Sequence, residues 1–414
     1  MLYDNAQLLP LYARAARRFG RPDFEDACEG IVAWLRREMA VADGGYAASL
    51  DADSEGEEGR HYLWQRDAVR DLLTPDEFAV AARRFGFDRA PNFEGTAWHP
   101  VLDKSIAEIV AALGQDESTI RALLASARAK LAAARAERPL PGRDDKRLTA
   151  WNALLASGLA RAARYLGRPD WAHLAVDVLD FIHERLWRDD RLYACFASGV
   201  ARFPAYLDDH AFLLDALIER LQCAWNVRDA AWASAVADRL IEDFEDRARG
   251  GFFFTAHDAE PLPHRPKPWM DDSLPGGNGV AARALLRLGH LTGKVRYLDA
   301  AQRVLHAGWH ALTEFAPACS ALLRALHDEL APRWLLRLHC APEREADWRG
   351  ALREDPIETL DVFVHTPDAT PWPVTPDPAG NDRDIAYLCR GSACEAPLTT
   401  PEALAEALRK VDPD

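Results

Sequence analysis

A repeated pair of helices is the feature that most constrains the fold of this sequence. Each copy is predicted to contain an apolar helix, a short turn with Gly or Asn, a second amphipathic helix, and a Gly-rich or Asp-rich turn. The first copy begins at Tyr3, turns at residues 20–22 and ends near Met39; the second begins near Ala150, turns at residues 167–169 and ends at Trp187. Both turns read Gly-Arg-Pro, and proline is favoured where a helix opens because its missing N–H costs nothing there.

Two further copies follow the same pattern. One begins at Asp208 and turns near Asn226, and the next begins near Gly277, turns at Gly293 and runs to about Leu312. The first helix of a pair is apolar on nearly every side and is expected to be buried, whereas the second carries charges on one face and is expected to lie outside. The repeat is longer than that of an open solenoid. The sequence therefore predicts a mainly α fold, a complete or incomplete (α/α) toroid of the six-hairpin glycosidase type.

The pattern changes in two places along the chain. The toroid is assigned to residues 1–330, with a helical insertion at about 56–146 that contains helices near 106–113 and 118–136. Residues 60–64 alternate like a hairpin strand, and His61 there is expected at the surface. Residues 331–414 are predicted to form a small α/β appendage, with strands at 334–338, 360–364 and 385–388 and a helix at 401–411.

Charge and hydropathy exclude several classes of partner. The formal net charge of -15 disfavours a nucleic acid, which needs clustered Lys and Arg. No apolar run approaches the roughly 20 residues that cross a bilayer, and the first residues do not form a secretory leader. We therefore expect a cytoplasmic protein with no membrane partner.

Cysteines and known motifs give little sign of a metal or cofactor. Among the seven cysteines, only Cys389 and Cys394 lie close in sequence, without the second pair or nearby His that zinc requires. They are expected to form a reduced pair or a disulfide. The sequence has no Gly-rich phosphate loop, HExxH or GxSxG motif. No metal and no cofactor are predicted.

Polar residues gather where the inner helices begin, which in a toroid is the mouth of a central cavity. Carboxylates that exchange protons and bind hydroxyls, together with aromatic rings that stack on a sugar, suit a carbohydrate pocket. The predicted catalytic residues are Asp209, His210 and Asp53, and the predicted substrate-binding residues are Asp4, Asn5, Asp51, Glu55, Trp151, Asn152, Asp208 and Asn278.

Each of these residues also has a structural interpretation. Asp and Asn are favoured at helix N-termini whatever the function, so Asp208 is also explained as a helix cap. His210 would suit an epimerase, which needs a group that titrates near neutrality, but a histidine at the start of a helix also fits a purely structural role.

Several strings of residues resemble the YyaL-type family of thioredoxin-domain-containing proteins, which includes the spermatogenesis-associated thioredoxin-like protein. The matching strings are MLYDNA (1–6), LDADSEGEEG (50–59), NFEG (92–95), PGRDDKRLTAWN (141–152), FPAYLDDHAF (203–212), RPKPWMDDSLPGGNGVA (265–281) and CRGSAC (389–394). They cover nearly the whole chain in the same order. The resemblance includes every predicted site residue except His210, where the family often has Tyr.

The resemblance implies a toroid similar to acylglucosamine and cellobiose 2-epimerases, preceded by a thioredoxin-like domain with a Cys-x-x-Cys site. Met1 falls at an internal methionine of the family, so we expect that domain and the first toroid helices to be missing and one apolar flank to be uncovered.

Two classes of function remain open at this stage. The first is a carbohydrate-active or carbohydrate-binding toroid, with sugar epimerase or isomerase chemistry ahead of glycoside hydrolysis. The alternative is a non-catalytic module that docks a thioredoxin-like or other protein, or a second copy of itself, across the uncovered flank.

Overall fold

The computed structural model describes residues 1–352, 359–365 and 384–410 and divides into two compact units. The first unit is Met1–Ala48 with Asp145–Asp414, and the second is Ser49–Asp144. Within the described ranges, no helix is both long enough and apolar enough to cross a membrane.

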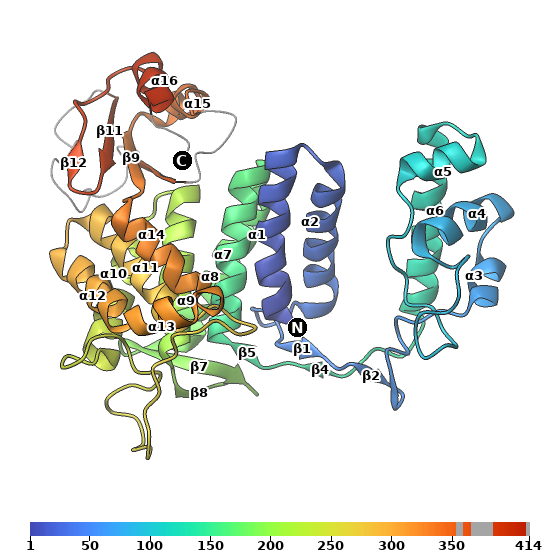
Figure 1. The fold of residues 1–414 in the computed structure, drawn as a ribbon, viewed down its shortest axis with the longest axis horizontal. Helices are drawn as coiled ribbons and strands as arrows, with labels where there is room; N and C mark the ends of the chain where they lie inside the picture. The colour runs from blue at the N-terminus through green and yellow to red at the C-terminus, as the bar shows by residue number, and fades with distance from the viewer. Residues whose placement is uncertain (353–358, 366–383, 411–414) are drawn as a thin grey trace. The chain divides into compact units, whose positions relative to one another are not determined.

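Helical hairpins build most of the first unit (Figure 1). Their inner helices are α1 (Leu2–Phe19), α7 (Thr149–Leu166), α9 (Leu207–Cys223) and α11 (Gly277–Thr292), and their outer helices are α2 (Pro22–Trp34), α8 (Pro169–Leu186), α10 (Val227–Phe244) and α12 (Val295–Ala307). Each inner helix packs on its own outer helix and on the next inner helix. The predicted mainly α fold, an (α/α) toroid, is confirmed.

The series of inner helices continues beyond the last predicted pair. After α12 the chain forms the short helix α13 (Trp309–Glu314) and then α14 (Ser320–Leu330), which packs on α11. The sequence pattern did not reveal α14. Near the other end of the chain, α2 runs into a π-helical turn at Leu35–Met39, which agrees with the predicted end near Met39.

A small antiparallel sheet connects α8 to α9. Its strands are β5 (Arg147–Leu148), β6 (Trp187–Arg188), β7 (Arg191–Ala197) and β8 (Val200–Pro204), with β7 paired to the other three. Because β5 leads directly into α7, this sheet fixes the starting point of two adjacent inner helices.

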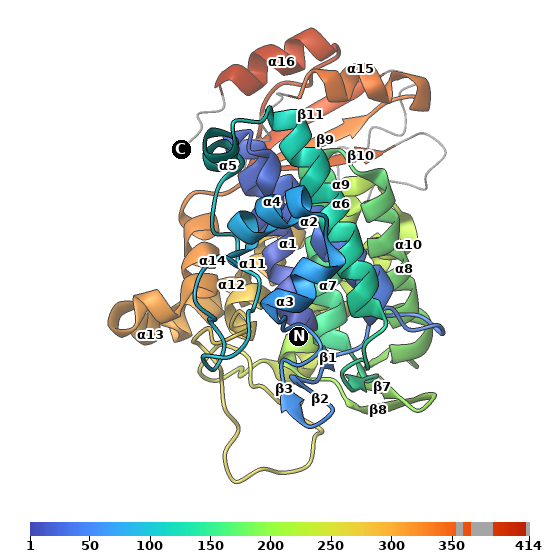
Figure 2. The same ribbon diagram turned by 90° about the vertical axis from the view of Figure 1, so that its right-hand side faces the viewer.

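A second sheet follows the helices of the first unit. Its order is β10 (Leu360–His365), β9 (Trp334–His339), β11 (Ile385–Arg390), β12 (Ala393–Cys394), with β10 parallel and β11 antiparallel to β9. Trp348 of α15 (Glu345–Gly350) and Leu404 of α16 (Pro401–Lys410) enter its apolar core, and Figure 2 shows both helices on one side of the strands. The strands β9, β10 and β11 and the helix α16 were predicted, whereas β12 was not. The last residue of the predicted helix, Val411, lies outside the described residues.

The end of this sheet carries the paired cysteines. Cys389 on β11 and Cys394 on β12 form a disulfide, which was one of the two predicted states.

The second unit has a core of its own. It contains α3 (Arg66–Leu72), α4 (Pro75–Phe85), α5 (Ile106–Leu113) and α6 (Glu117–Ala136), a hairpin of β2 (Asp53–Ser54) and β3 (Glu57–Glu58), and a pair formed by β1 (Ser49–Leu50) and β4 (Arg143–Asp144). The predictions of α5 and α6 are confirmed. The predicted strand at residues 60–64 is wrong, because these residues form turns with a single bridge at Trp64. His61 is buried rather than exposed, and its Nδ1 lies 3.0 Å from the Pro139 carbonyl oxygen.

Candidate functional site

Two of the predicted binding residues hold loops in place. Asn152 on α7 accepts a hydrogen bond from the Tyr46 N–H at 2.8 Å and donates to the Tyr46 carbonyl at 3.1 Å. Asn278 on α11 makes the same two hydrogen bonds with Phe252: it accepts from the Phe252 N–H at 2.8 Å and donates to the Phe252 carbonyl at 3.0 Å. Both asparagines are fully buried.

The same loop motif precedes both asparagines. Each clamped aromatic residue follows two glycines with positive φ, Gly44 and Gly45 in one loop and Gly250 and Gly251 in the other. Glycine is required there because L side chains rarely adopt that conformation. The pairing of a Gly-Gly-aromatic turn with an inner-helix asparagine is therefore a structural signature of the repeat.

Asp209 and His210 also make structural contacts. The Asp209 carboxylate accepts hydrogen bonds from the N–H groups of Ala150 and Tyr206, both at 2.8 Å, and so ties the start of α9 to the start of α7. Burial raises the pKa of Asp209 to about 7. The His210 ring lies 4.9 Å from the Phe244 ring of the outer helix α10, and burial lowers the pKa of His210 to about 4. Neither side chain lines a described cavity of the first unit.

The remaining candidates on α1 and α7 lie near the starts of their helices. Asp4 is exposed and lies 3.5 Å from the N-terminal amino group, and the Asn5 side chain donates to the Met1 carbonyl at 3.0 Å. The Trp151 ring packs edge-on against Tyr3 with 4.7 Å between ring centroids. Trp151 lies one turn before Leu154, which lines the cavity described below, so the two side chains share one side of α7.

The three acidic candidates of the 51–55 loop belong to the second unit. The Asp53 N–H donates to the Asp51 carboxylate at 3.1 Å, and Glu55 forms an ion pair with Arg60 at 2.9 Å. Glu55 and His61 line a cavity of about 810 Å³ within that unit. Their predicted contribution to a site with the inner helices stays a prediction.

Asp208 differs from its neighbour Asp209. Its Oδ1 is buried and has no hydrogen-bond partner in the described part of the chain. Burial raises the pKa of Asp208 to about 6. Asp208 does not itself line the central cavity, but it lies one turn before Phe212 on α9, which does.

The central cavity is a space of about 580 Å³ between the inner helices. It is lined by polar and aromatic side chains from five helices and from the loop before α11: Gln7 and Arg14 of α1, Ser157, Arg161 and Tyr165 of α7, Phe212 and Asp215 of α9, Arg283 of α11, Arg324 of α14, and Asp271 and Asp272. Arg161 donates to the two oxygens of Asp215 at 3.0 and 2.7 Å, and Ser157 donates to the same carboxylate at 2.7 Å.

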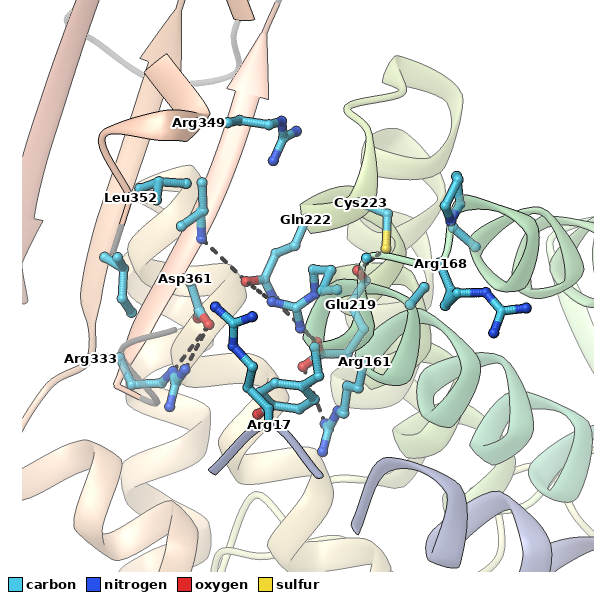
Figure 3. A pocket seen from close by; sticks show the side chains of 18 of the residues that line it. Arg17, Arg161, Arg168, Glu219, Gln222, Cys223, Arg333, Arg349, Leu352 and Asp361 are labelled. Carbon is cyan, nitrogen blue, oxygen red and sulfur yellow. Dashed lines mark hydrogen bonds and ion pairs between the residues drawn. The ribbon is translucent and has the colours of Figure 1, made fainter. Parts of the chain in front are cut away.

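A second cavity, the arginine pocket, lies at the other end of the inner helices and has a volume of about 690 Å³. The described residues that line it include eight arginines, namely Arg17, Arg161, Arg164, Arg168, Arg283, Arg324, Arg333 and Arg349, and the acids Glu219 and Asp361. Figure 3 shows Arg17, Arg333 and Arg349 around this space, with Glu219 and Asp361 among them.

A buried ion-pair network forms the wall of the arginine pocket. Arg287 donates to Glu219 at 2.7 Å and to Asp361 at 2.9 and 3.1 Å, and Arg333 also donates to Asp361 at 2.9 Å. Burial alone would raise the pKa of Asp361, but Arg287 and Arg333 hold it well below its usual range. The network therefore carries permanent charge and joins α9, α11 and β10.

The charged lining was missed at the sequence level because the inner helices were interpreted as apolar on nearly every side. The signal was present: Arg161 stands in α7 among alanines and leucines, and Asp215 and Glu219 lie one turn apart in α9. Charges placed at three-to-four spacing on an otherwise buried helix indicate a polar stripe that faces a shared interior.

Together these features define an (α/α) toroid with a ligand-sized cavity and a charged interior. No model of a known protein family matches the chain. Over 99% of its length the chain is 27% identical to human spermatogenesis-associated protein 20 and 26% identical to the rat protein. An uncharacterised protein of Caenorhabditis elegans is 24% identical over the same share. The predicted resemblance to the spermatogenesis-associated family is confirmed, and the chain spans 57% of the human relative.

The chain also has low similarity to solved structures. A GH76 α-mannanase of Bacteroides thetaiotaomicron has a TM-score of 0.44 and 12% identity, covering 79% of this chain and 69% of that one. A cellobiose 2-epimerase of Spirochaeta thermophila has a TM-score of 0.36 and 14% identity, covering 76% of this chain and 74% of that one. No residue role is transferred from either protein.

Proposed function

We propose that the first unit binds a carbohydrate in the central cavity. The observation that carries this proposal is the lining, because donors, carboxylates and two aromatic rings from five helices line one partly open space. Sugar hydroxyls need donors and acceptors together, and aromatic faces pack against the C–H side of a sugar ring. The volume lies within the range of about 300–1,000 Å³ that small-molecule sites occupy.

We further propose that Asp208 transfers a proton in an epimerase or isomerase reaction. Such a reaction removes the proton next to a carbonyl carbon and returns a proton to the substrate, so it needs no redox partner. A carboxyl group with a pKa near 6 is present in both protonation states at neutral pH. Asp209 is less suited to this step because two backbone N–H groups already occupy its carboxylate.

Deuterium exchange tests the proposed chemistry directly. The chain would be incubated in D₂O with glucose, mannose, N-acetylglucosamine and cellobiose, and incorporation at C2 followed by NMR. We expect exchange with one of these sugars, a loss of at least about 100-fold in Asp208→Asn, and retained sugar binding in a thermal-shift assay.

The control is Asp26→Asn, which changes an exposed aspartate of the outer helix α2. It should leave both exchange and binding unchanged. Absence of any sugar-dependent thermal shift in folded protein would overturn the binding proposal, whereas binding without exchange would overturn only the catalytic part.

A second candidate function is self-association through α1. Leu8, Leu11 and Phe19 are 40%, 58% and 68% exposed, and their spacing places them on one side of the helix. Asp4 in the first turn and Arg18 in the last turn flank that side. Two copies of α1 packed antiparallel would bury the apolar stripe and set Asp4 of each copy against Arg18 of the other.

Light scattering tests this second candidate. The chain should be dimeric at micromolar concentration, and Leu8→Asp, which changes a residue of the stripe outside the central cavity, should make it monomeric. A monomer at every concentration reached by the unchanged chain would exclude self-association.

A further inference from the structure

We infer that the arginine pocket binds a phosphate group, so that the ligand of the central cavity is a phosphate ester of a sugar. This inference rests on the proposed function for the sugar part and on the arginine pocket alone for the phosphate part. It goes beyond the predicted sugar site, since none of the predicted site residues lines this pocket.

Two arginines of the pocket have no hydrogen-bond or ion-pair partner among the residues that the structure describes. Arg17 on α1 and Arg324 on α14 make neither a hydrogen bond nor an ion pair with any described residue, and both are accessible from solvent. Burial lowers the pKa of Arg324 and the charges of Arg161 and Arg333 lower it further, whereas the charges of Asp215 and Asp328 raise it. Arg324 thus lies near charges of both signs but donates to no described acid, so its guanidinium donors are available to a bound anion.

The two acids among the described residues that line the pocket are already paired. Glu219 is paired with Arg164 and lies 3.2 Å from Arg161 and 2.7 Å from Arg287. Asp361 is paired with Arg287 and Arg333. Neither carboxylate is therefore available to neutralise Arg17 or Arg324.

Composition and helix dipoles do not account for the surplus of positive charge. The chain as a whole carries a net charge of -15, so a cluster of arginines in one pocket is not explained by an excess of basic residues in the sequence. Cations are favoured in the last turn of a helix, which explains Arg17 and Arg164. Arg283 and Arg324 lie in the first halves of α11 and α14, away from the last turn, so the dipole does not explain them.

The two cavities share part of their lining. Arg161, Tyr165, Arg283 and Arg324 line both the central cavity and the arginine pocket. A sugar in the central cavity would therefore place a charged substituent among these guanidinium groups.

Phosphate fits this arrangement better than a carboxylate. A phosphate monoester carries close to two negative charges at neutral pH and offers three oxygens, so several guanidinium groups from different directions can bind it. A carboxylate has one charge and two oxygens, which a single arginine satisfies.

Isothermal titration with inorganic phosphate, pyrophosphate, glucose and glucose 6-phosphate tests the inference. We expect phosphate and pyrophosphate to bind, glucose 6-phosphate to bind at least about ten-fold more tightly than glucose, and affinity to fall as salt is raised. Arg324→Gln should weaken binding of the phosphate compounds by about 10-fold to 100-fold. Because Arg324 has no partner acid, this variant leaves no carboxylate unpaired, and its fold is checked by its melting temperature.

The matched control is Arg185→Gln, an exposed arginine of the outer helix α8 outside both cavities. It should bind phosphate as the unchanged chain does. No phosphate binding in the folded chain, or equal binding in Arg324→Gln, would overturn the inference.

The outcomes also separate the inference from the proposed function. Phosphate binding without any contribution from the sugar would support the arginine pocket and count against the carbohydrate site. Glucose binding with no gain from the 6-phosphate would retain the carbohydrate site and reject the phosphate ester.

Discussion

At the scale of single residues, the adjacent aspartates Asp208 and Asp209 differ in their hydrogen bonds, and we assign them different roles for that reason. Asp209 uses both carboxylate oxygens to accept backbone N–H groups, whereas Asp208 has a buried oxygen without a partner. Asp209→Asn keeps the shape but turns an NH₂ group toward a backbone N–H. We expect a loss on the order of 1–3 kcal/mol in the free energy of unfolding, measured with urea.

Asp208→Asn is the matched comparison for that prediction. It removes a charge from a buried site and breaks no hydrogen bond of the described residues, so the free energy of unfolding at neutral pH should stay the same or rise. A larger loss in Asp208→Asn than in Asp209→Asn would contradict the assigned roles.

His210 gives a prediction about pH. Burial lowers its pKa to about 4, whereas the unfolded value is about 6.5. Above that unfolded value the ring is neutral in both states and its stabilising contribution is complete. As pH falls below about 6.5, the unfolded chain binds a proton that the folded chain does not, so stability is lost until about pH 4.

The variant His210→Phe isolates this effect, since it cannot bind the proton. From about pH 7 to about pH 5, the stability of the unchanged chain relative to His210→Phe should fall by roughly 2 kcal/mol in urea unfolding. A relative stability that does not change with pH would show that His210 binds its proton equally well in the folded and unfolded chains.

At the scale of helices, close packing of α1 and α7 depends on Gly158. A Cβ atom at this position would lie 2.4 Å from the Ala6 carbonyl oxygen. Gly158→Ala should therefore lower the free energy of unfolding by about 1–3 kcal/mol even though alanine is the better helix former. Gly30 on the outer helix α2 has no atom within 4 Å of such a Cβ.

Gly30→Ala is therefore expected to stabilise the protein by about 0.5–1 kcal/mol. Thermal or urea unfolding of the two variants compares the effects directly. If both substitutions stabilise, α1 and α7 can move apart without cost and the close contact is not required.

The hairpins were predictable because their signals are local. Gly20 and Gly167 end α1 and α7 in the left-handed conformation, and Pro22 and Pro169 open the next helices. The helix α4 was missed as a separate element although Thr74 and Glu77 form a capping box at its start. Capping residues such as these are thus sufficient to locate the ends of the helices from the sequence.

The interior of the toroid was not predictable in the same way. The pairs Arg161 with Asp215 and Arg287 with Asp361 join residues far apart in sequence. No local pattern gives the partner of a buried charge, because the partner is set by which helices become neighbours. The predicted site therefore concentrated on the helix starts, where Asn152 and Asn278 prove to hold loops.

At the scale of the first unit, Arg287 couples the helices to the C-terminal sheet. Its side chain is 2% exposed and bonds Glu219 of α9 and Asp361 of β10. Replacing it by Leu would leave both acids buried with fewer partners. We expect Arg287→Leu to lower the free energy of unfolding by about 3–5 kcal/mol, because an unpaired buried charge is strongly destabilising.

Arg296 provides the control, because it is 53% exposed and pairs with Asp238 at the surface. Arg296→Leu should cost no more than about 1 kcal/mol, as exposed pairs contribute little. The two urea unfolding curves should be accompanied by hydrogen exchange at β10, whose amides should exchange faster in Arg287→Leu only.

Faster exchange at β10 without a change in α11 would mean that the sheet opens by itself, with Arg287 as its attachment to the helices. Equal costs for the two variants would instead show that the buried network is no stronger than a surface ion pair, and the arginines of the pocket would then be held in place by packing alone.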